Sequence, residues 1–496
     1  RPMAGVLVTV RPAGEQKVLA FAQTSAEGRF EVTLTAYAPD RVLHFSMMGY
    51  APRTLSIEAG RTTYDVTLKE QATALREVVI RAPSIHERGD TITYIVARFA
   101  TAGDRSLADV LKKMPGIEVE KSGAIKYNGT AINKFYIEGK DMLGGRYGIA
   151  TNNIHPADVG SVEVMENHQP VKALENISFS HNPAINIRLK EDAKARWVGS
   201  IRAAVGGSPL LWDAELALMR FKRQSQTLNT LKSNNTGRDV TREATAYLDA
   251  GDHEALLTEH ITVAPDRLRE IDGDRSRFNR SHIVTSNNLW GVAKNYDLTS
   301  QVTYADHRLT SDVESRQTYF LDDSTVVTEA DEHTVSRRNA FTGDVTLTAN
   351  TPTWYFRNKL RTDLRWDDTQ QSVAGTYPNH QSAALPRHAF SDDLELIRRH
   401  GRRAYSLHSL NVYRVHPHRL DVERADGTTQ QQSVESSVFY THTHTALSFY
   451  FAPVALSLRA GLVGTWRRLQ SALTGVPDSL GPLRNDIATR HLRLYV

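Results

Sequence analysis

The 496-residue chain has no cysteine, which excludes disulfide bonds and cysteine-ligated metal centres. It has no apolar run near the ~18 residues that a membrane-spanning helix needs. Lys and Arg barely outnumber Asp and Glu, 60 to 56, and form no basic cluster, so nucleic-acid binding has no support. A cysteine-free chain of this size is compatible with the oxidising periplasm.

Motifs for catalysis and metal binding are also missing. The sequence has no Gly-x-Ser-x-Gly elbow and no His-Glu-x-x-His pair, and residues 144–148 lack the order of a dinucleotide-binding loop. His442 and His444 share one face of a predicted strand, as a metal pair would, but no further ligand is nearby. We expect no enzyme activity, no cofactor and no metal.

From about Arg196 onward the sequence alternates between apolar and polar residues, which is typical of β-strands with two different faces. The clearest case is 354–366. Its even positions are Trp354, Phe356, Asn358, Leu360, Thr362, Leu364 and Trp366, and its odd positions are Tyr355, Arg357, Lys359, Arg361, Asp363 and Arg365. A ladder of charge therefore runs along one face, and it cannot contact hydrocarbon, where a central Arg or Lys costs about 2–4 kcal/mol.

The two Trp residues of this strand are 12 positions apart, at 354 and 366. At about 3.3 Å per residue and a tilt of about 40°, they are separated by roughly 30 Å along a barrel axis. Membrane barrels have an apolar band about 25 Å tall between two aromatic girdles. Trp354 and Trp366 fit the two girdles.

Connections between the predicted strands alternate between short and long. Consecutive antiparallel strands reverse at opposite rims, so this alternation puts all the short turns on one rim, as in bacterial outer-membrane barrels. A soluble antiparallel sheet with one wet face would show the same residue alternation but not this asymmetry. The short turns are 222–225, 291–295, 351–353, 398–403 and 452–453, and the long connections are 236–278, 308–338, 367–385, 416–432 and 471–486.

The first 69 residues predict a small β-sandwich. Short strand patterns at 6–10, 18–21, 30–34, 42–46, 54–57 and 65–68 are separated by turn signals rich in glycine. At Ser25-Ala26-Glu27-Gly28-Arg29-Phe30 and Met48-Gly49-Tyr50 the segment resembles the carboxypeptidase-regulatory-like domain. That resemblance implies an accessory module without catalytic residues.

Residues 91–192 are predicted to mix α and β structure, after a linker at 70–90. Ser106 and Asp109 form a capping-box-like start, and Leu107, Val110, Leu111 and Met114 then lie on one helical face. Pro115-Gly116 ends this helix. Strands are predicted around 117–120, 125–127, 134–137, 161–165 and 185–189, with a flexible Gly-rich loop at 144–148.

Four motifs in this segment resemble, in order, the plug domain of TonB-dependent outer-membrane receptors. They are Leu111-Lys112-Lys113-Met114-Pro115-Gly116-Ile117-Glu118-Val119, Phe135-Tyr136-Ile137-Glu138-Gly139-Lys140, Val162-Glu163-Val164-Met165-Glu166-Asn167 and Ala184-Ile185-Asn186-Ile187-Arg188-Leu189. The resemblance implies a plug inside an antiparallel transmembrane β-barrel of 22 strands. Residues 193–496 supply about 12 strands, so we expect a C-terminally incomplete barrel in a fragment of a longer protein.

The resemblance also implies site residues and partners. Glu77, Val78, Val79 and Ile80 are candidates for pairing with the energy-coupling protein TonB, against the alternative that this segment is only the last strand of the sandwich or a strand of the plug. In the plug loop, Arg146, Tyr147, Asn152 and Asn153 are candidates for ligand contact, against the alternative of a solvated turn. Outer-membrane lipid is expected around the barrel, and a surface lipoprotein partner is compatible with the family.

The function predicted from this resemblance is energy-coupled uptake of a nutrient through a plugged barrel in the outer membrane of a Gram-negative bacterium. The N-terminal domain and the plug would lie on the periplasmic side. The alternative is a surface binding or adhesion receptor that does not transport. The sequence leaves open whether the ligand is a small molecule, a glycan or a peptide.

Overall fold

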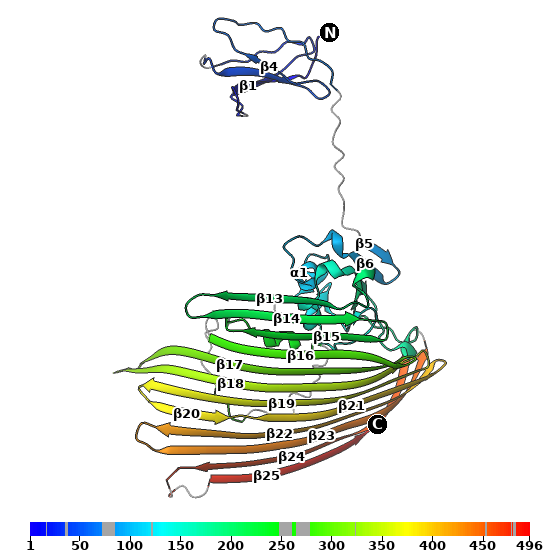
Figure 1. Ribbon diagram of the computed structural model, residues 1–496, viewed down its shortest axis with the longest axis vertical. Coiled ribbons are helices and arrows are strands. Elements are labelled where there is room, and N and C mark those ends of the chain that lie inside the picture. The colour runs from blue at the N-terminus through cyan, green and yellow to red at the C-terminus, as the bar shows by residue number, and fades with distance from the viewer. Residues whose placement is uncertain are drawn as a thin grey trace. The chain divides into compact units, whose positions relative to one another are not determined.

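A computed structural model describes residues 1–15, 17–34, 38–71, 85–120, 123–247, 260–263, 278–322, 324–451, 454–477, 479 and 483–496. The chain forms two compact units, Arg1–Ala82 and Pro83–Val496 (Figure 1). In the second unit, residues 85–193, here called the mixed domain, precede one large antiparallel sheet that begins at Val198. No helix among the described residues has both the length and the apolar character needed to cross a bilayer.

The first unit contains one four-stranded antiparallel sheet. Its order is β2-β1-β3-β4, and the strands are β1 (Leu7–Pro12), β2 (Ala20–Gln23), β3 (Arg41–Ser46) and β4 (Arg53–Ser56). These confirm four of the predicted strands. Val8 and Val10 on the central strand are fully buried and pack with Phe45 of β3.

The other two predicted strands of this unit, 30–34 and 65–68, form no ladder among the described residues. Phe30, Val32 and Leu34 still pack against the sheet, and Val66 and Leu68 do the same. Alternate residues of any extended segment point to one side. The apolar alternation therefore indicates which side chains are buried, but not whether the backbone pairs with another strand. A second sheet of the predicted sandwich is not formed by the described residues.

The mixed domain has a five-stranded sheet, β10-β12-β11-β6-β5, and a three-stranded sheet, β7-β8-β9. Ile85–Arg88, expected in the linker, forms strand β5. All four residues of this edge strand are exposed, so no alternating burial marks them in the sequence. The elements are β5, β6 (Thr91–Ile95), η1 (Val96–Arg98), α1 (Leu107–Leu111), β7 (Ile117–Val119), β8 (Ile125–Tyr127), β9 (Thr130–Ala131), β10 (Lys134–Ile137), α2 (Gly148–Asn153), η2 (Pro156–Asp158), β11 (Val159–Met165), η3 (Lys172–Leu174), β12 (Ala184–Leu189) and η4 (Glu191–Ala193).

Helix α1 begins where the capping box predicts. The Asp109 carboxylate accepts hydrogen bonds from the backbone N–H of Ser106 at 3.0 Å and of Arg105 at 3.1 Å. Leu107, Leu111 and Met114 on its apolar face are at most 2% exposed and join the core of the domain. Gly116 then adopts a φ of +79°, and a Cβ at this position would lie 2.7 Å from the Asn128 side chain. The turn that follows the helix therefore requires glycine at position 116.

The large sheet has 13 strands. Neighbours in sequence are neighbours in space, except that β20 and β21 are successive pieces that both lie between β19 and β22. The strands are β13 (Val198–Gly206), β14 (Leu211–Phe221), β15 (Ser225–Asn234), β16 (Phe278–Ala293), β17 (Tyr296–Phe320), β18 (Thr325–Asn350), β19 (Trp354–Gly375), β20 (Asn379–Ala384), β21 (Arg387–His400), β22 (Arg403–Arg424), β23 (Thr429–Phe451), β24 (Val454–Thr474) and β25 (Leu483–Tyr495).

Two different faces distinguish this sheet. On β19, Tyr355 and Lys359 are each 8% exposed, whereas Leu360 is 52% exposed on the opposite face. The apolar face continues across strands through directly paired residues, as predicted by the alternation. One row is Val284, Tyr304, Phe341 and Leu364, and another is Phe390, Tyr413, Phe439 and Trp466.

The short turns at 222–225, 291–295, 351–353 and 398–403 are confirmed, whereas 452–453 lies outside the described residues. Three predicted long connections are wrong, because the strands continue through most of 308–338, 367–385 and 416–432 as paired hairpins. In 471–486, strand β24 extends to Thr474 and β25 begins at Leu483, so half of that range is strand. The hairpin of β17 and β18 projects on the side opposite the short turns (Figure 1). Both faces are polar there, so the alternation disappears although the backbone pairing continues. In 236–278, the described residues before Phe278 form no strand.

We predict that Asp109→Ala lowers the free energy of opening helix α1 by about 1 kcal/mol, because two backbone N–H groups lose their acceptor. Hydrogen exchange of the amides in 105–111 should then accelerate about fivefold. Asp109→Asn, which keeps an acceptor oxygen, should change exchange less. Equal exchange in Asp109→Ala and the unaltered chain would show that the capping box does not hold this helix.

Candidate functional site

The mixed domain is bound to the polar face of the large sheet by side chains far apart in the sequence. Lys140 Nζ is 2.7 Å from Asp297 of β17. Gln226 of β15 donates to the Ile137 carbonyl at 2.9 Å, and Asn350 of β18 donates to the Pro170 carbonyl at 2.8 Å. Polar groups on both sides therefore satisfy one another across this interface.

Arg146 lies at the centre of the interface. Its Nη1 donates to Gln301 Oε1 at 2.6 Å and its Nη2 to Asp344 Oδ2 at 2.8 Å. Gln301 and Asp344 are direct cross-strand partners on β17 and β18, so the guanidinium binds one row of the sheet. Arg146 is 2% exposed, and burial lowers its pKa while Asp344 opposes that shift. An arginine stays charged at neutral pH, so this is a buried ion pair.

The Gly-rich segment 144–148 is not the flexible loop that the sequence predicted. A Cβ on Gly144 would lie 3.0 Å from the Gln301 amide, and Gly148 begins helix α2. Tyr147 is 2% exposed, and its hydroxyl accepts a hydrogen bond from the Ile125 N–H at 3.0 Å. Burial raises the pKa of Tyr147 to about 12, so the phenol is neutral and acts as part of the core.

The two asparagines of α2 have different surroundings. Asn152 is exposed, whereas Asn153 is 9% exposed and donates to Glu243 Oε2 at 3.2 Å. Glu243 belongs to η5 (Val240–Ala244), which follows β15 and precedes β16. The Tyr247 N–H donates to the Gly145 carbonyl at 3.2 Å. Residues 235–247, here called the inserted segment, thus pack on the mixed domain.

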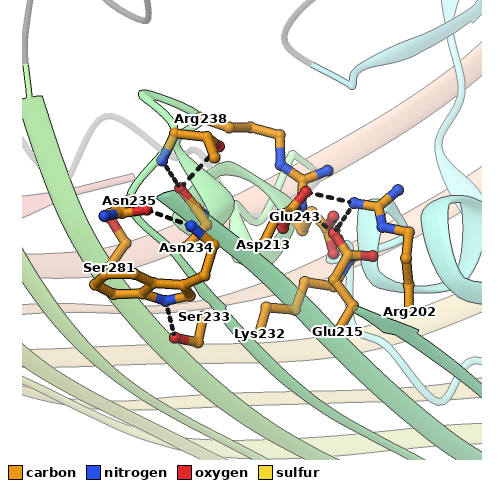
Figure 2. Close-up of polar contacts among 12 residues, drawn as sticks. Arg202, Asp213, Glu215, Lys232, Ser233, Asn234, Asn235, Arg238, Glu243 and Ser281 are labelled. Atoms are coloured by element: carbon orange, nitrogen blue, oxygen red, sulfur yellow. Dashed lines mark hydrogen bonds and ion pairs between the residues drawn. The ribbon is translucent and has the colours of Figure 1, made fainter. Parts of the chain in front are cut away.

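Ion pairs hold the inserted segment to the sheet (Figure 2). Lys232 of β15 is 2% exposed, and its Nζ is 2.6 Å from Glu243 Oε1 and 3.5 Å from Glu215 Oε2. Arg238 pairs with Glu215 and, at 3.0 Å, with Asp213. A lysine buried this deeply needs negative charge beside it. Of the two carboxylates near Lys232, Glu243 comes from the inserted segment and Glu215 from the sheet.

A cavity of about 820 Å³ lies between Arg146, the inserted segment and the polar face of β16–β19, β21 and β22. It contains six cationic side chains and three carboxylates among its walls. Its lining residues are Arg146, Asp239, Thr241, Ala244, Thr245, Ala246, Ile283, Thr303, Ala305, His307, Arg338, Ala340, Thr342, Lys359, Arg361, Asp363, Arg365, Ala389, Ser391, Asp393, His408, Leu410, Val412 and Arg414. Cavities of 300–1,000 Å³ are typical of small-molecule sites.

Among the predicted ligand-contact residues, Arg146 lines this cavity and Tyr147, Asn152 and Asn153 do not. Glu77, Val78, Val79 and Ile80 lie outside the described residues, so their pairing with TonB stays a prediction. The alternation of residues in the sequence predicted the row of charged side chains on β19. It did not predict that Arg146 lies at the same cavity as that row. No local signal joins residues 146 and 344, because they meet only through tertiary packing.

His442 and His444 lie beside each other, with ring centroids 5.0 Å apart, and His408 is 5.1 Å from His444. His408 Nε2 is 3.1 Å from Asp393, and His442 Nε2 is 2.8 Å from the Tyr495 hydroxyl. Within the described part of the chain, no three His, Asp or Glu side chains are arranged to hold a metal ion.

No family model matches the chain, and no curated protein matches it. Among solved structures, the chain is similar to the ferric yersiniabactin uptake receptor FyuA from Yersinia pestis, with 12% identity and a TM-score of 0.39 over 82% of this chain and 60% of that one. It is also similar to the ferric-catecholate import receptor Fiu from E. coli K12, with 13% identity and a TM-score of 0.32 over 82% and 66%.

A third similar structure is the ferric citrate transporter FecA, with 8% identity and a TM-score of 0.36 over 81% of this chain and 59% of that one. The chain spans less than two thirds of each of these three proteins. At these identities and TM-scores, the likeness assigns the chain neither a family nor a ligand.

We predict that Glu243→Ala releases the inserted segment, because Lys232 loses its nearer carboxylate and Asn153 loses an acceptor. Losing buried, charged hydrogen bonds costs about 1–3 kcal/mol, so exchange of the Tyr247 amide should accelerate about fivefold or more. Arg242→Ala is the matched control, since Arg242 is exposed and, among the described residues, forms its ion pair with Asp239 of the same segment. If both variants exchange alike, the Lys232–Glu243 pair does not anchor the segment.

Proposed function

We propose that this chain is a TonB-dependent receptor of a Gram-negative outer membrane, which takes up a nutrient ligand through a plugged β-barrel. The division of the large sheet into two faces carries the proposal. One face exposes rows of apolar side chains, and the other binds a folded domain through polar contacts. Lipid covers the first face, and the mixed domain is the plug behind the second.

Strand lengths support this placement. Crossing the hydrocarbon takes about 9–11 residues per strand, whereas β17 has 25 residues and β18 has 26. The excess length lies on the hairpin side, since the opposite ends are joined by turns of a few residues. Short turns face the periplasm in bacterial outer-membrane barrels. The hairpins would then extend outside the cell, with the N-terminal unit and the plug on the periplasmic side.

The contacts of the plug also suit a domain that must move. Hydrogen bonds and ion pairs join it to the sheet, together with apolar contacts such as those of Val171 and Ala173 with Tyr355, and water can replace the polar bonds at a small net cost for each. Its apolar core is largely its own, from Tyr94 and Leu107 to Leu189. TonB, pairing as an added strand near Glu77, would pull on the plug and open a path from the cavity.

Changing both Val78→Pro and Val79→Pro should abolish energy-coupled uptake, because proline has no N–H for strand pairing. The purified variant should also lose binding to the periplasmic domain of TonB, measured by biolayer interferometry. The nutrient for the uptake measurement is identified first, as one that no longer supports growth when the gene for this protein is deleted.

The control is Val78→Thr with Val79→Thr, which keeps β-branched side chains and both N–H groups and should keep both properties. Unchanged uptake and TonB binding in the proline variant would show that coupling does not occur at this segment. A chain that binds ligand but shows no TonB binding and no uptake would instead be a surface receptor without transport.

A further inference from the structure

Three arginines on neighbouring strands lie side by side on the apolar face of the large sheet. Arg280 of β16 is directly opposite Arg308 of β17, and Arg308 is directly opposite Arg337 of β18. All three residues are exposed. They share a face with Tyr304, since residues of one strand that differ by an even number point to one side. Neighbouring strands are about 4.8 Å apart, so these residues, here called the arginine row, span about 10 Å.

The arginine row lies beyond the apolar part of this face, on the side of the hairpins (Figure 1). Toward the short turns, the next paired row is mixed and the one after it is apolar. The mixed row is His282, Asp306, Asn339 and Trp366, and the apolar row is Val284, Tyr304, Phe341 and Leu364. At about 3.3 Å per residue, the arginines are about 13 Å from this apolar row along the strands.

The arrangement of the arginine row favours an anion. Like charges directly opposite each other destabilise an antiparallel sheet, and here two such pairs are adjacent. Two carboxylates flank the row on the same face, Asp306 of β17 and Asp368 of β19, and neither lies between two of its arginines. Among the described residues, the contact of the row within hydrogen-bond distance is that of Arg280 Nε with His282 Nε2, at 3.4 Å. An anion placed over the row would relieve the repulsion.

Phosphate is the anion that suits this site. A guanidinium group binds phosphate through two parallel hydrogen bonds, and adjacent guanidinium groups can bind one headgroup together. The apolar row nearby adds a second requirement, since Val284 and Tyr304 are each 46% exposed. A lipid with a phosphate-bearing headgroup meets both requirements, because its acyl chains cover the apolar row while its phosphates reach the arginines.

We propose that Arg280, Arg308 and Arg337 bind the phosphate groups of an anionic lipid in the outer half of the membrane. This inference rests on the proposed function, which places this face in lipid and the hairpins outside the cell. The arginine row is therefore a lipid site on the outer surface of the barrel, separate from the cavity that faces the mixed domain.

The test measures how much lipid the detergent-purified chain retains, by native mass spectrometry after incubation with lipid A, which carries two phosphates. The arginine-row variant combines Arg280→Gln, Arg308→Gln and Arg337→Gln, and it should retain at least fivefold less lipid A than the unaltered chain. In the unaltered chain, retention should fall as salt is added. Monophosphoryl lipid A, with one phosphate, should also be retained less.

The matched control removes the same charge elsewhere, through Arg223→Gln, Arg316→Gln and Arg402→Gln. Arg223 and Arg402 lie in short turns, and the Arg316 side chain is 69% exposed on the hairpin of β17 and β18. This control should retain lipid A like the unaltered chain. Inorganic phosphate alone should not bind saturably at millimolar concentrations, because it makes no contact with the apolar row.

Equal retention of lipid A by the arginine-row variant and the unaltered chain would overturn the inference. Equal loss in the control variant would do the same, since it would show only an effect of total charge. Inorganic phosphate binding as tightly as lipid A would make the row a site for a free anion. The proposed function is tested separately: lipid retention through the row without TonB binding would keep the lipid site and refute the transport role.

Discussion

The structure depends on one constraint, which is that the strands of the large sheet, outside their polar hairpin ends, present opposite kinds of surface on their two faces. Side chains alternate across a strand, so β19 can place Leu360 on one side and Lys359 on the other. If lipid covers the apolar face, as proposed, reversing the faces would put Lys359 and Arg361 against hydrocarbon, at about 2–4 kcal/mol for each central charge. Register is therefore strongly specified, since a shift of one residue exchanges the faces of a whole strand.

The polar face then determines what lies against it. A wall with buried Lys232, Gln301 and Asp344 needs polar partners. The mixed domain supplies them to Gln301 and Asp344, and the inserted segment supplies one to Lys232. Where neither reaches the wall, the described residues leave a cavity of about 820 Å³.

Much of this arrangement could be predicted from the sequence, and the rest could not for identifiable reasons. Helix α1 is determined locally by Ser106, Asp109 and the spacing of four apolar residues, and the turn at 351–353 by the break in alternation. The hairpins of β17 and β18 were mistaken for loops because strands polar on both faces have no pattern to detect. Arg146 looked like a loop residue, because the Gly-rich sequence around it is typical of turns and its partners are more than 150 positions away.

The central claim is that lipid covers the apolar face, and site-directed spin labelling tests it directly. The chain has no cysteine, so Leu360→Cys and Tyr319→Cys each give one labelling site, and both native side chains are about half exposed, at 52% and 51%. In reconstituted bilayers, the account predicts that oxygen relaxes the label at 360 while a water-soluble nickel chelate does not, with the reverse at 319. Equal access of the nickel chelate to both labels would contradict it.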